Sequence, residues 1–209
     1  MKPPDSSAGA QWDARFAAED YVYGTKPNGF LVEVTPSLPP APARVLSLGE
    51  GEGRNGVYLA SLGYQVTGVD ASAVGLRKAE RLAAERGLSI TTLVTDLAGF
   101  SITPGAWDVV VAIFCHLPKP LRQRVHRAAV AGLRPGGLFV LEAYTPAQLA
   151  LRTGGPPVRE LLYTAEELRE ELAGLEFPVL RELERDVVEG QLHTGRAAVV
   201  QVLGRKPSP

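Results

Sequence analysis

Apolar runs alternate with amphipathic stretches along most of the chain. Five runs, each followed by a turn signal, predict buried strands, and apolar positions spaced three and four residues apart predict helices beside them. The predicted strands cover residues 45–48, 64–69, 90–94, 107–114 and 138–144. Two further strands, 179–189 and 196–203, close the pattern as a hairpin. This order predicts an α/β fold, a three-layer sandwich with right-handed crossovers.

The first predicted strand ends in a stretch of alternating glycines, Gly49-Glu50-Gly51-Glu52-Gly53, and a helical pattern follows it. Such a turn exposes the first N–H groups of the helix and allows a ligand to approach the backbone closely. The next strand ends in Asp70, whose carboxylate can accept both hydroxyls of a ribose. These signals predict a nucleotide-type cofactor at the carboxyl ends of parallel strands.

The residues between the glycines favour one cofactor over another. Gly51-x-Gly53-x-x-Gly56 fits the dinucleotide fingerprint. However, Glu50 and Glu52 would place two carboxylates beside a pyrophosphate, and no Lys within the loop offsets them. S-adenosylmethionine carries no phosphate but has a sulfonium and an ammonium, which suit nearby carboxylates. We therefore favour S-adenosylmethionine over NAD; the structural alternative is a tight turn with both glutamates solvated.

These motifs resemble a known family. The stretch 48–53 and Gly68-Val69-Asp70 look like motifs I and II of the class I S-adenosylmethionine-dependent methyltransferases. Trp12-Asp13-x-Arg15-Phe16 and the stretch 21–31 are similar to the tellurite-resistance/thiopurine-type branch of small methyltransferases. The resemblance covers about residues 10–204 and implies a Rossmann-like, seven-stranded, mostly parallel sheet with an antiparallel last strand. Motif I usually opens with an acid, but this chain has Ser47 there, and the role of that acid is open between Glu50 and Glu52.

The resemblance also implies an acid near the adenine amino group. We carry that role to Asp96, with Leu97 covering the ring; the alternative is that Asp96 makes a local turn. The predicted cofactor site comprises Gly49, Glu50, Gly51, Gly53, Asn55, Asp70, Ala71, Ser72, Asp96, Leu97 and Phe114.

The fourth strand ends in Cys115-His116, at the same predicted edge. His116 is the candidate general base or substrate-steering group, and the alternative is a structural histidine bound to backbone. We interpret Cys115 as a packed small hydrophobe rather than a nucleophile. His126, which lies among Arg residues, is expected to be solvated, and His193 in the last turn is expected to be structural.

Substrate contacts are expected from two segments. Tyr23 belongs to an N-terminal segment that serves either as a lid or as aromatic packing on the core. Tyr144 and Arg152 belong to the strand end and the long irregular segment 145–158, and loops of this length are often lids or binding loops. Arg159 and Tyr163 are further candidates, and a solvated connection is the alternative for this segment.

Composition sets limits on the partners. The chain has 209 residues, a net charge of -1 and a single cysteine. We expect one domain over 1–209: a disordered tail at 1–9, an N-terminal lid with helices at 10–42, a cofactor-binding core at 43–144, and a substrate loop, helix and terminal hairpin at 145–209. The charge offers no case for binding nucleic acid or an anionic membrane, and no apolar run is long enough for a membrane span. We expect no metal, a cytoplasmic location, and a monomer or homodimer.

We therefore predict transfer of the methyl group of S-adenosylmethionine to a small-molecule acceptor, which leaves S-adenosylhomocysteine. No clear base constellation is present, and this favours a thiol or metalloid acceptor over an oxygen or nitrogen acceptor. The alternatives are an NAD-dependent oxidoreductase, a non-catalytic S-adenosylmethionine-binding regulator, and a methyltransferase acting on a protein.

Overall fold

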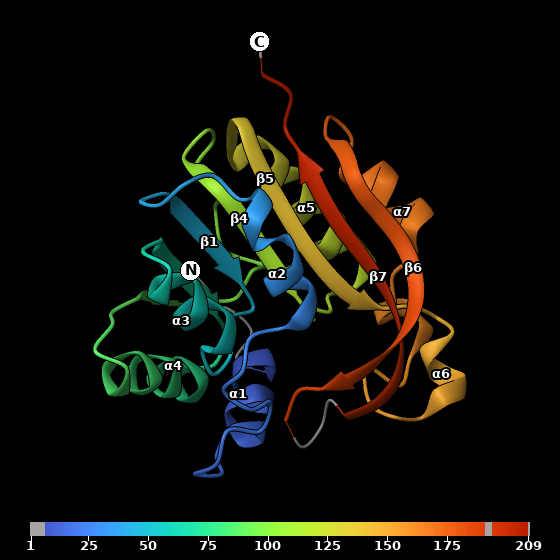
Figure 1. The fold of residues 1–209 in the computed structure, drawn as a ribbon. Helices are drawn as coiled ribbons and strands as arrows, with labels where there is room; N and C mark the ends of the chain where they lie inside the picture. The colour runs from blue at the N-terminus through green and yellow to red at the C-terminus, as the bar shows by residue number, and fades with distance from the viewer. Residues whose placement is uncertain (1–6, 191–193, 209) are drawn as a thin grey trace.

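A single seven-stranded sheet organises the molecule (Figure 1). The computed structural model describes residues 7–190 and 194–208, so the prediction for His193 lies outside the described residues. The strand order is β3-β2-β1-β4-β5-β7-β6. The first five strands in this order are parallel to one another, and β7 runs antiparallel to its two neighbours, β5 and β6. The strands are β1 (Arg44–Leu48), β2 (Gln65–Asp70), β3 (Thr91–Val94), β4 (Trp107–Ile113), β5 (Leu133–Tyr144), β6 (Glu176–Val188) and β7 (Thr194–Arg205). The predicted fold is confirmed.

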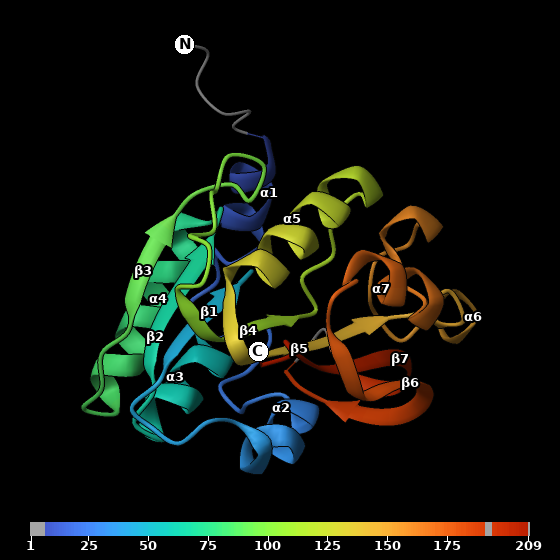
Figure 2. The same cartoon turned by 90° about the horizontal axis from the view of Figure 1, so that it is seen from above.

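Alternation along the central strands assigns their side chains to two cores. In β4, Val109 and Val111 pack in the cluster that also contains Phe30 of α2 (Gly29–Val34), whereas Val110 packs in the cluster that contains Val125 of α5 (Lys119–Gly132). Both clusters are buried, as expected for parallel strands covered on both faces. Figure 2 shows α2 and α3 (Arg54–Ser61) on one side of the sheet and α5 and α7 (Ala165–Glu171) on the other.

Capping residues define the helix starts. The Asn28 side chain accepts a hydrogen bond from the Leu31 amide, and the Thr164 side chain accepts one from the Glu167 amide, so these two residues are the N-caps of their helices. The α-helices are α1 (Ser7–Arg15), α2 (Gly29–Val34), α3 (Arg54–Ser61), α4 (Ala73–Glu85), α5 (Lys119–Gly132), α6 (Gln148–Leu151) and α7 (Ala165–Glu171); two short 3-10 helices span Thr35–Ser37 and Arg159–Leu161. No helix within the described ranges is both long enough and apolar enough to cross a bilayer.

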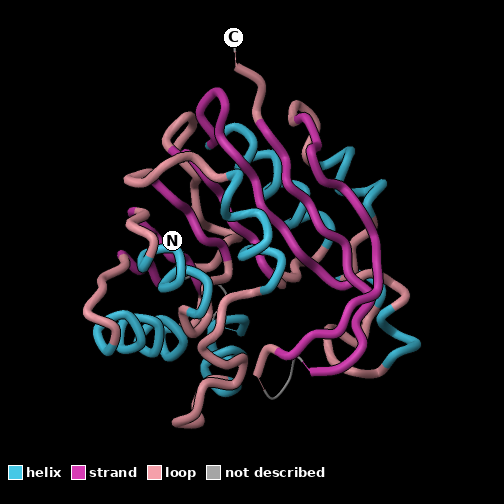
Figure 3. The backbone as a smooth tube through the Cα atoms, in the orientation of Figure 1, coloured by secondary structure: helices cyan, strands magenta, loops and turns pink. Residues whose placement is uncertain are grey.

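The long strands β6 and β7 continue past the rest of the sheet and curve towards the N-terminal part of the chain (Figure 3). Gly190, just after β6, lies directly against the backbone of Tyr23 and Gly24, where a Cβ on Gly190 would clash. The hairpin therefore meets the N-terminal segment beside the carboxyl edge of the sheet.

The expectation that His126 is solvated is wrong. Its side chain is 3% exposed and its Nδ1 lies 2.8 Å from Glu171 Oε2. Glu171 also binds Arg122, at 2.7 Å to NH2 and 3.0 Å to Nε. The Arg residues beside His126 in sequence do not share its environment, because successive helix positions point in different directions. The contact with Glu171 joins α5 to α7.

Candidate functional site

The glycine loop after β1 is held by the end of β2. The amides of Gly49 and Glu50 both donate to the carbonyl oxygen of Val69, at 2.9 and 3.1 Å. Asp70 Oδ2 accepts a hydrogen bond from the Gly51 amide, and its Oδ1 accepts one from the Ser72 amide, both at 2.8 Å. Burial raises the pKa of Asp70, and these two amides oppose that shift. Asp70 thus fixes the loop and the start of α4 at the same edge.

The loop requires glycine for both backbone geometry and space. Gly51 has φ of 59°, and a Cβ there would lie 3.4 Å from the Phe16 ring. Gly49 has φ of 66°, and its Cβ would lie 2.9 Å from the sulfur of Cys115. These positive φ values favour glycine, and the close neighbours show that the loop is packed on two sides.

The two loop carboxylates differ in their partners. Glu52 Oε1 lies 2.5 Å from Lys78 Nζ, and Glu52 Oε2 accepts a hydrogen bond from the Tyr23 amide at 3.2 Å. No Lys lies within the loop itself, but Lys78 reaches Glu52 from α4 and offsets its charge. Glu50 instead turns its side chain inwards, where Oε1 accepts a hydrogen bond from the Gly56 amide at 2.8 Å. Among the residues that the structure describes, only Glu52 has a lysine partner, so the charge argument against a diphosphate now rests on Glu50 alone.

Residues 12–23 lie over the glycine loop. Phe16 is 3% exposed, stacks with Trp12 at 5.5 Å and meets the edge of Tyr23 at 6.1 Å. Asp13 Oδ1 accepts hydrogen bonds from the Ser72 hydroxyl at 2.6 Å and from the Val74 amide at 2.9 Å. These bonds lower the pKa of Asp13. Phe16 and Asp13 could be read from the sequence, but only their tertiary contacts show that they bind the glycine loop and the start of α4.

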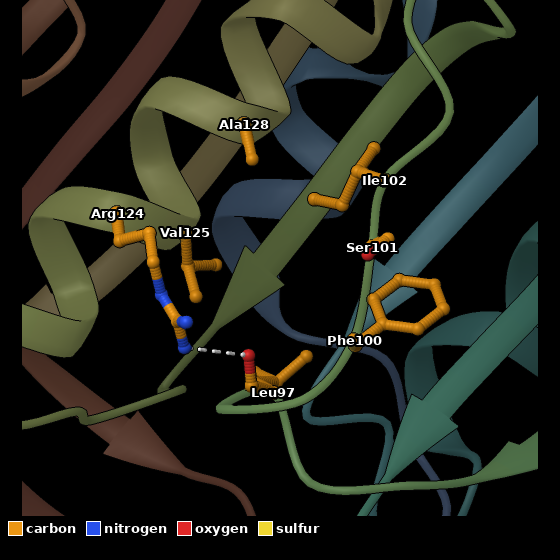
Figure 4. Close-up of a pocket in the computed structure, with 7 residues that line it drawn as sticks. All are labelled: Leu97, Phe100, Ser101, Ile102, Arg124, Val125 and Ala128. Atoms are coloured by element: carbon orange, nitrogen blue, oxygen red, sulfur yellow. Dashed lines mark hydrogen bonds between the residues drawn. The ribbon is translucent and has the colours of Figure 1, made fainter.

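The predicted adenine contacts lie after β3. Asp96 Oδ1 accepts a hydrogen bond from the Ala98 amide at 2.7 Å, which is the local turn given as the alternative. Leu97 is 7% exposed and also lines a pocket of about 280 Å³ against α5 (Figure 4). The pocket is lined by Leu97, Phe100, Ser101, Ile102, Arg124, Val125 and Ala128. Leu97 is the residue that this pocket shares with the predicted cofactor site.

Aromatic rings gather after β4 and β5. Phe114 has φ of 51°, which is unusual for a residue other than glycine, and such strain is often found at functional sites. Its ring centroid lies 4.7 Å from that of Tyr144, and the His116 ring stacks on Tyr144 at 5.6 Å. These three side chains belong to the edge that carries the glycine loop.

His116 is poorly suited to act as a base. Its Nδ1 lies 2.7 Å from the Leu161 carbonyl oxygen, and its Nε2 lies 3.5 Å from the Tyr144 amide. Burial among the rings lowers the pKa of His116 to about 4. His116 is therefore neutral at pH 7 and weakly basic, and its contacts match the structural interpretation. Burial raises the pKa of Cys115 to about 12, which matches a packed thiol.

The predicted substrate contacts separate into two groups. Tyr144 and Tyr163 are 1% and 0% exposed, and Gly155 covers the Tyr144 ring. Tyr163 donates a hydrogen bond to the Cys115 carbonyl at 2.7 Å, and both tyrosines are covered in this conformation, so their contact with substrate stays a prediction. Tyr23 is half-buried and Arg152 is exposed. Arg159 binds the Leu162 carbonyl at 3.2 Å, and its side chain is also exposed.

A buried polar network, which we did not predict, lies beside this edge. Glu189 binds Arg54 NH1 at 2.5 Å, Arg185 NH2 at 2.8 Å and Asn28 Nδ2 at 3.0 Å. Glu142 binds Arg185 at 2.7 Å and the same Asn28 amide at 2.5 Å. The two Arg and two Glu charges balance. Neither patterning nor spacing reveals the network, because its members come from the N-terminal segment, α3, β5 and the hairpin.

The residues of the loop fit an adenosyl cofactor in chemical terms. Asp70 can accept ribose hydroxyls, and the first N–H groups of α3 can bind a carboxylate. Residues 45–137, which contain β1 from its second residue, the loop and Asp70, match a family model described as "Methyltransferase domain". Over these residues the chain is similar to methyltransferase domains. The matched region contains all the predicted cofactor residues.

Two curated methyltransferases are similar in sequence. The 2-heptyl-1-hydroxyquinolin-4(1H)-one methyltransferase of Mycobacteroides abscessus is 32% identical over 120 residues, which are 56% of this chain and 53% of that protein. The ubiquinone biosynthesis O-methyltransferase of Xanthomonas axonopodis pv. citri is 34% identical over 129 residues, which are 58% of this chain and 52% of that protein. The matched region thus spans about half the length of these relatives.

Solved structures support the fold. TehB from Haemophilus influenzae superposes on this methyltransferase fold with a TM-score of 0.70 and 20% identity, covering 95% of this chain and 67% of TehB. At this level of identity the similarity concerns the fold alone. It agrees with the class I architecture but does not define a branch of the family.

Proposed function

We propose that this protein transfers the methyl group of S-adenosylmethionine to a small-molecule acceptor in a single in-line step. The observation that carries the proposal is the glycine loop of the methyltransferase domain, fixed by Asp70 at the carboxyl edge of the sheet. When bound, S-adenosylmethionine supplies an already activated methyl group. The protein then has to hold donor and acceptor close together and in line, which lowers the barrier by several kcal/mol, about 7–11 at the limit.

The proposed acceptor is a thiol or a metalloid species, as in the tellurite-resistance/thiopurine-type branch. This assignment is supported by the weak basicity of His116, whose pKa of about 4 suits an acceptor that needs no proton removed by the enzyme. A second candidate is an acidic hydroxyl, because the names of the two curated relatives specify a hydroxyquinolone and an O-methyltransferase. Each kind of acceptor can attack the methyl group without an enzymatic base, the hydroxyl as an anion and the thiol or metalloid through a soft atom.

Cofactor binding is tested first. S-adenosylhomocysteine should raise the melting temperature of the protein, whereas NAD and FAD should leave it unchanged. Asp70→Ala should weaken S-adenosylmethionine binding at least about tenfold in calorimetry, because charge-assisted hydrogen bonds are worth about 1.5–3 kcal/mol each. A thermal shift with NAD alone would favour the oxidoreductase instead. Binding of S-adenosylmethionine without turnover of any acceptor would favour the non-catalytic regulator.

The acceptor class is tested with matched pairs of aryl thiols and phenols that differ in acidity. We expect kcat/KM to follow the ionised fraction of the acceptor as the pH is raised. Comparable turnover of a weakly acidic alcohol at neutral pH would require an enzymatic base and would contradict the proposed acceptor class.

A further inference from the structure

Glu50 stands in the middle of the glycine loop, but its side chain turns into the interior between β2 and the first turn of α3. It is 6% exposed, and its Oε1 accepts a hydrogen bond from the Gly56 amide at 2.8 Å. Its Oε2 is also buried and has no hydrogen-bond partner among the residues that the structure describes. The Ser47 hydroxyl lies close enough to favour the charged form of this carboxyl group. A buried carboxylate with one oxygen that lacks a hydrogen bond lowers the stability of the fold, so the presence of glutamate at this position needs an explanation.

Two glycines make room for this side chain. A Cβ on Gly56 would lie 2.8 Å from Glu50 Cδ, and a Cβ on Gly68 would lie 2.8 Å from Glu50 Cγ. Neither glycine has a positive φ, so backbone geometry does not require glycine at either position. Glycine inside a helix or strand costs about 0.5–1 kcal/mol relative to alanine. Three positions, Ser47, Gly56 and Gly68, therefore form a socket that fits the Glu50 side chain.

We propose that Glu50, seated in this socket, is a positioning residue that holds the glycine loop from below and supplies the negative charge that favours the cationic donor over the neutral product. The inference rests on the proposed function. It assigns the role of the motif I acid, absent at Ser47, to Glu50 rather than to Glu52, whose charge is offset by Lys78. S-adenosylmethionine and S-adenosylhomocysteine share the adenosyl and amino-acid groups and differ at sulfur, which is a cation only in the donor. A nearby carboxylate therefore separates the two.

The same charge makes the discrimination depend on pH. Burial raises the pKa of Glu50 to about 7, with the Asp70 carboxylate at the end of β2 adding to the shift, and with Ser47, the Gly56 amide and Arg54 of α3 opposing it. Glu50 is thus mostly neutral below about pH 6 and mostly ionised above about pH 8. Because a cation binds the ionised form better, the preference for the donor should grow as the pH rises through this window.

The test is calorimetric titration of the full-length protein with S-adenosylmethionine and with S-adenosylhomocysteine at about pH 6 and about pH 8. The readout is the ratio of the two dissociation constants, in which protonation of the shared amino group cancels. In the wild type we expect this ratio to shift about fivefold towards the donor at the higher pH, as a weak interaction between separated charges would give. In Glu50→Gln the ratio should not change with pH, while S-adenosylhomocysteine still binds.

An exchange variant, Ser47→Asp/Glu50→Ser, returns a carboxylate to the socket from β1. It should recover the preference for the donor that Glu50→Gln loses, and it keeps the test decisive if the single variant does not fold. Equal ratios in the wild type and Glu50→Gln at both pH values would overturn the inference. Failure of the wild type to bind either ligand would instead overturn the proposed function.

Discussion

At the scale of single residues, burial changes what a side chain can do. His116 is the histidine nearest the reaction edge among the described residues, yet packing between Tyr144 and Tyr163 lowers its pKa to about 4. Its Nδ1 is directed to the Leu161 carbonyl, which fixes the tautomer if the ring is neutral. The ring therefore contributes a fixed hydrogen bond rather than a proton acceptor tuned to neutral pH.

His116→Asn tests this assignment, because an amide can still donate to the Leu161 carbonyl. We expect turnover to stay within about threefold of the wild type, far less than the 10²–10⁴-fold that loss of a general base costs. His116→Ala removes the donor and should lower the free energy of unfolding by about 1–3 kcal/mol. Turnover assays and urea denaturation measure the two effects. A hundredfold loss of turnover in a stable Asn variant would restore His116 as a base.

Glu171 gives a second prediction at this scale. Burial alone would raise its pKa, but hydrogen bonds from His126 and Arg122 hold the pKa below its usual value. Glu171→Gln leaves the Arg122 cation buried with a weaker partner, so we expect a loss of about 3–5 kcal/mol in unfolding free energy. Glu167→Gln is the matched control: it also contacts Arg122, at 3.2 Å, but is more exposed, and it should cost less than about 1 kcal/mol. Equal losses in the two variants would contradict this account.

At the scale of elements, the hairpin and the N-terminal segment meet at Gly190. A Cβ on Gly190 would clash with the backbone of Tyr23 and Gly24, and its φ is 79°. Gly87 has φ of 67° but open space around it. Both substitutions to alanine add similar backbone strain, whereas Gly190→Ala alone disturbs the contact between the two elements.

We therefore expect Gly190→Ala to increase hydrogen exchange in residues 16–28 and to weaken S-adenosylhomocysteine binding, while Gly87→Ala lowers stability alone. Hydrogen exchange by mass spectrometry and calorimetry separate these outcomes. If both variants behave alike, the contact between the hairpin and the N-terminal segment has no part in holding the cofactor site.

The elements could be predicted from sequence because their signals are local. The apolar run before Gly49, the cap at Asn28 and the capping box at Thr164 each lie within a few residues of the element they define. The partners of the acids could not be predicted, because Lys78 reaches Glu52 from another helix and Glu189 reaches Arg54 from the far end of the chain. Side-chain direction within the loop was equally hidden: Glu50 and Glu52 are two positions apart, yet one points inwards and the other to Lys78.

At the scale of the whole molecule, the network around Glu189 links parts of the chain that are distant in sequence. Glu189 joins Arg54 at the start of α3, Arg185 of β6 and Asn28 of the N-terminal segment. Burial alone would raise the pKa of Glu189, but Arg54 and Arg185 lower it overall. The ionised Glu189 therefore stabilises the fold at pH values above the unfolded-state pKa of about 4.3. This stabilisation is lost as the pH falls through the lower folded-state pKa. Glu50 changes stability with pH in the opposite direction. Because burial raises its pKa, its contribution lowers the free energy of unfolding as the pH rises towards about 7.

Glu189→Gln should therefore lower the free energy of unfolding at neutral pH by about 3–5 kcal/mol, because it leaves buried arginine charge with less compensation. The loss should shrink in acid, since protonation removes the same charge from the wild type. Glu184→Gln, an exposed position on the same strand paired with Arg196 at 3.1 Å, should change stability by less than about 1 kcal/mol at either pH. Urea denaturation of the three proteins from about pH 2 to about pH 7 measures these differences, because the range has to extend below the lowered folded-state pKa of Glu189. A constant difference between Glu189→Gln and the wild type across this range would show that packing, rather than charge, holds the hairpin against the N-terminal segment.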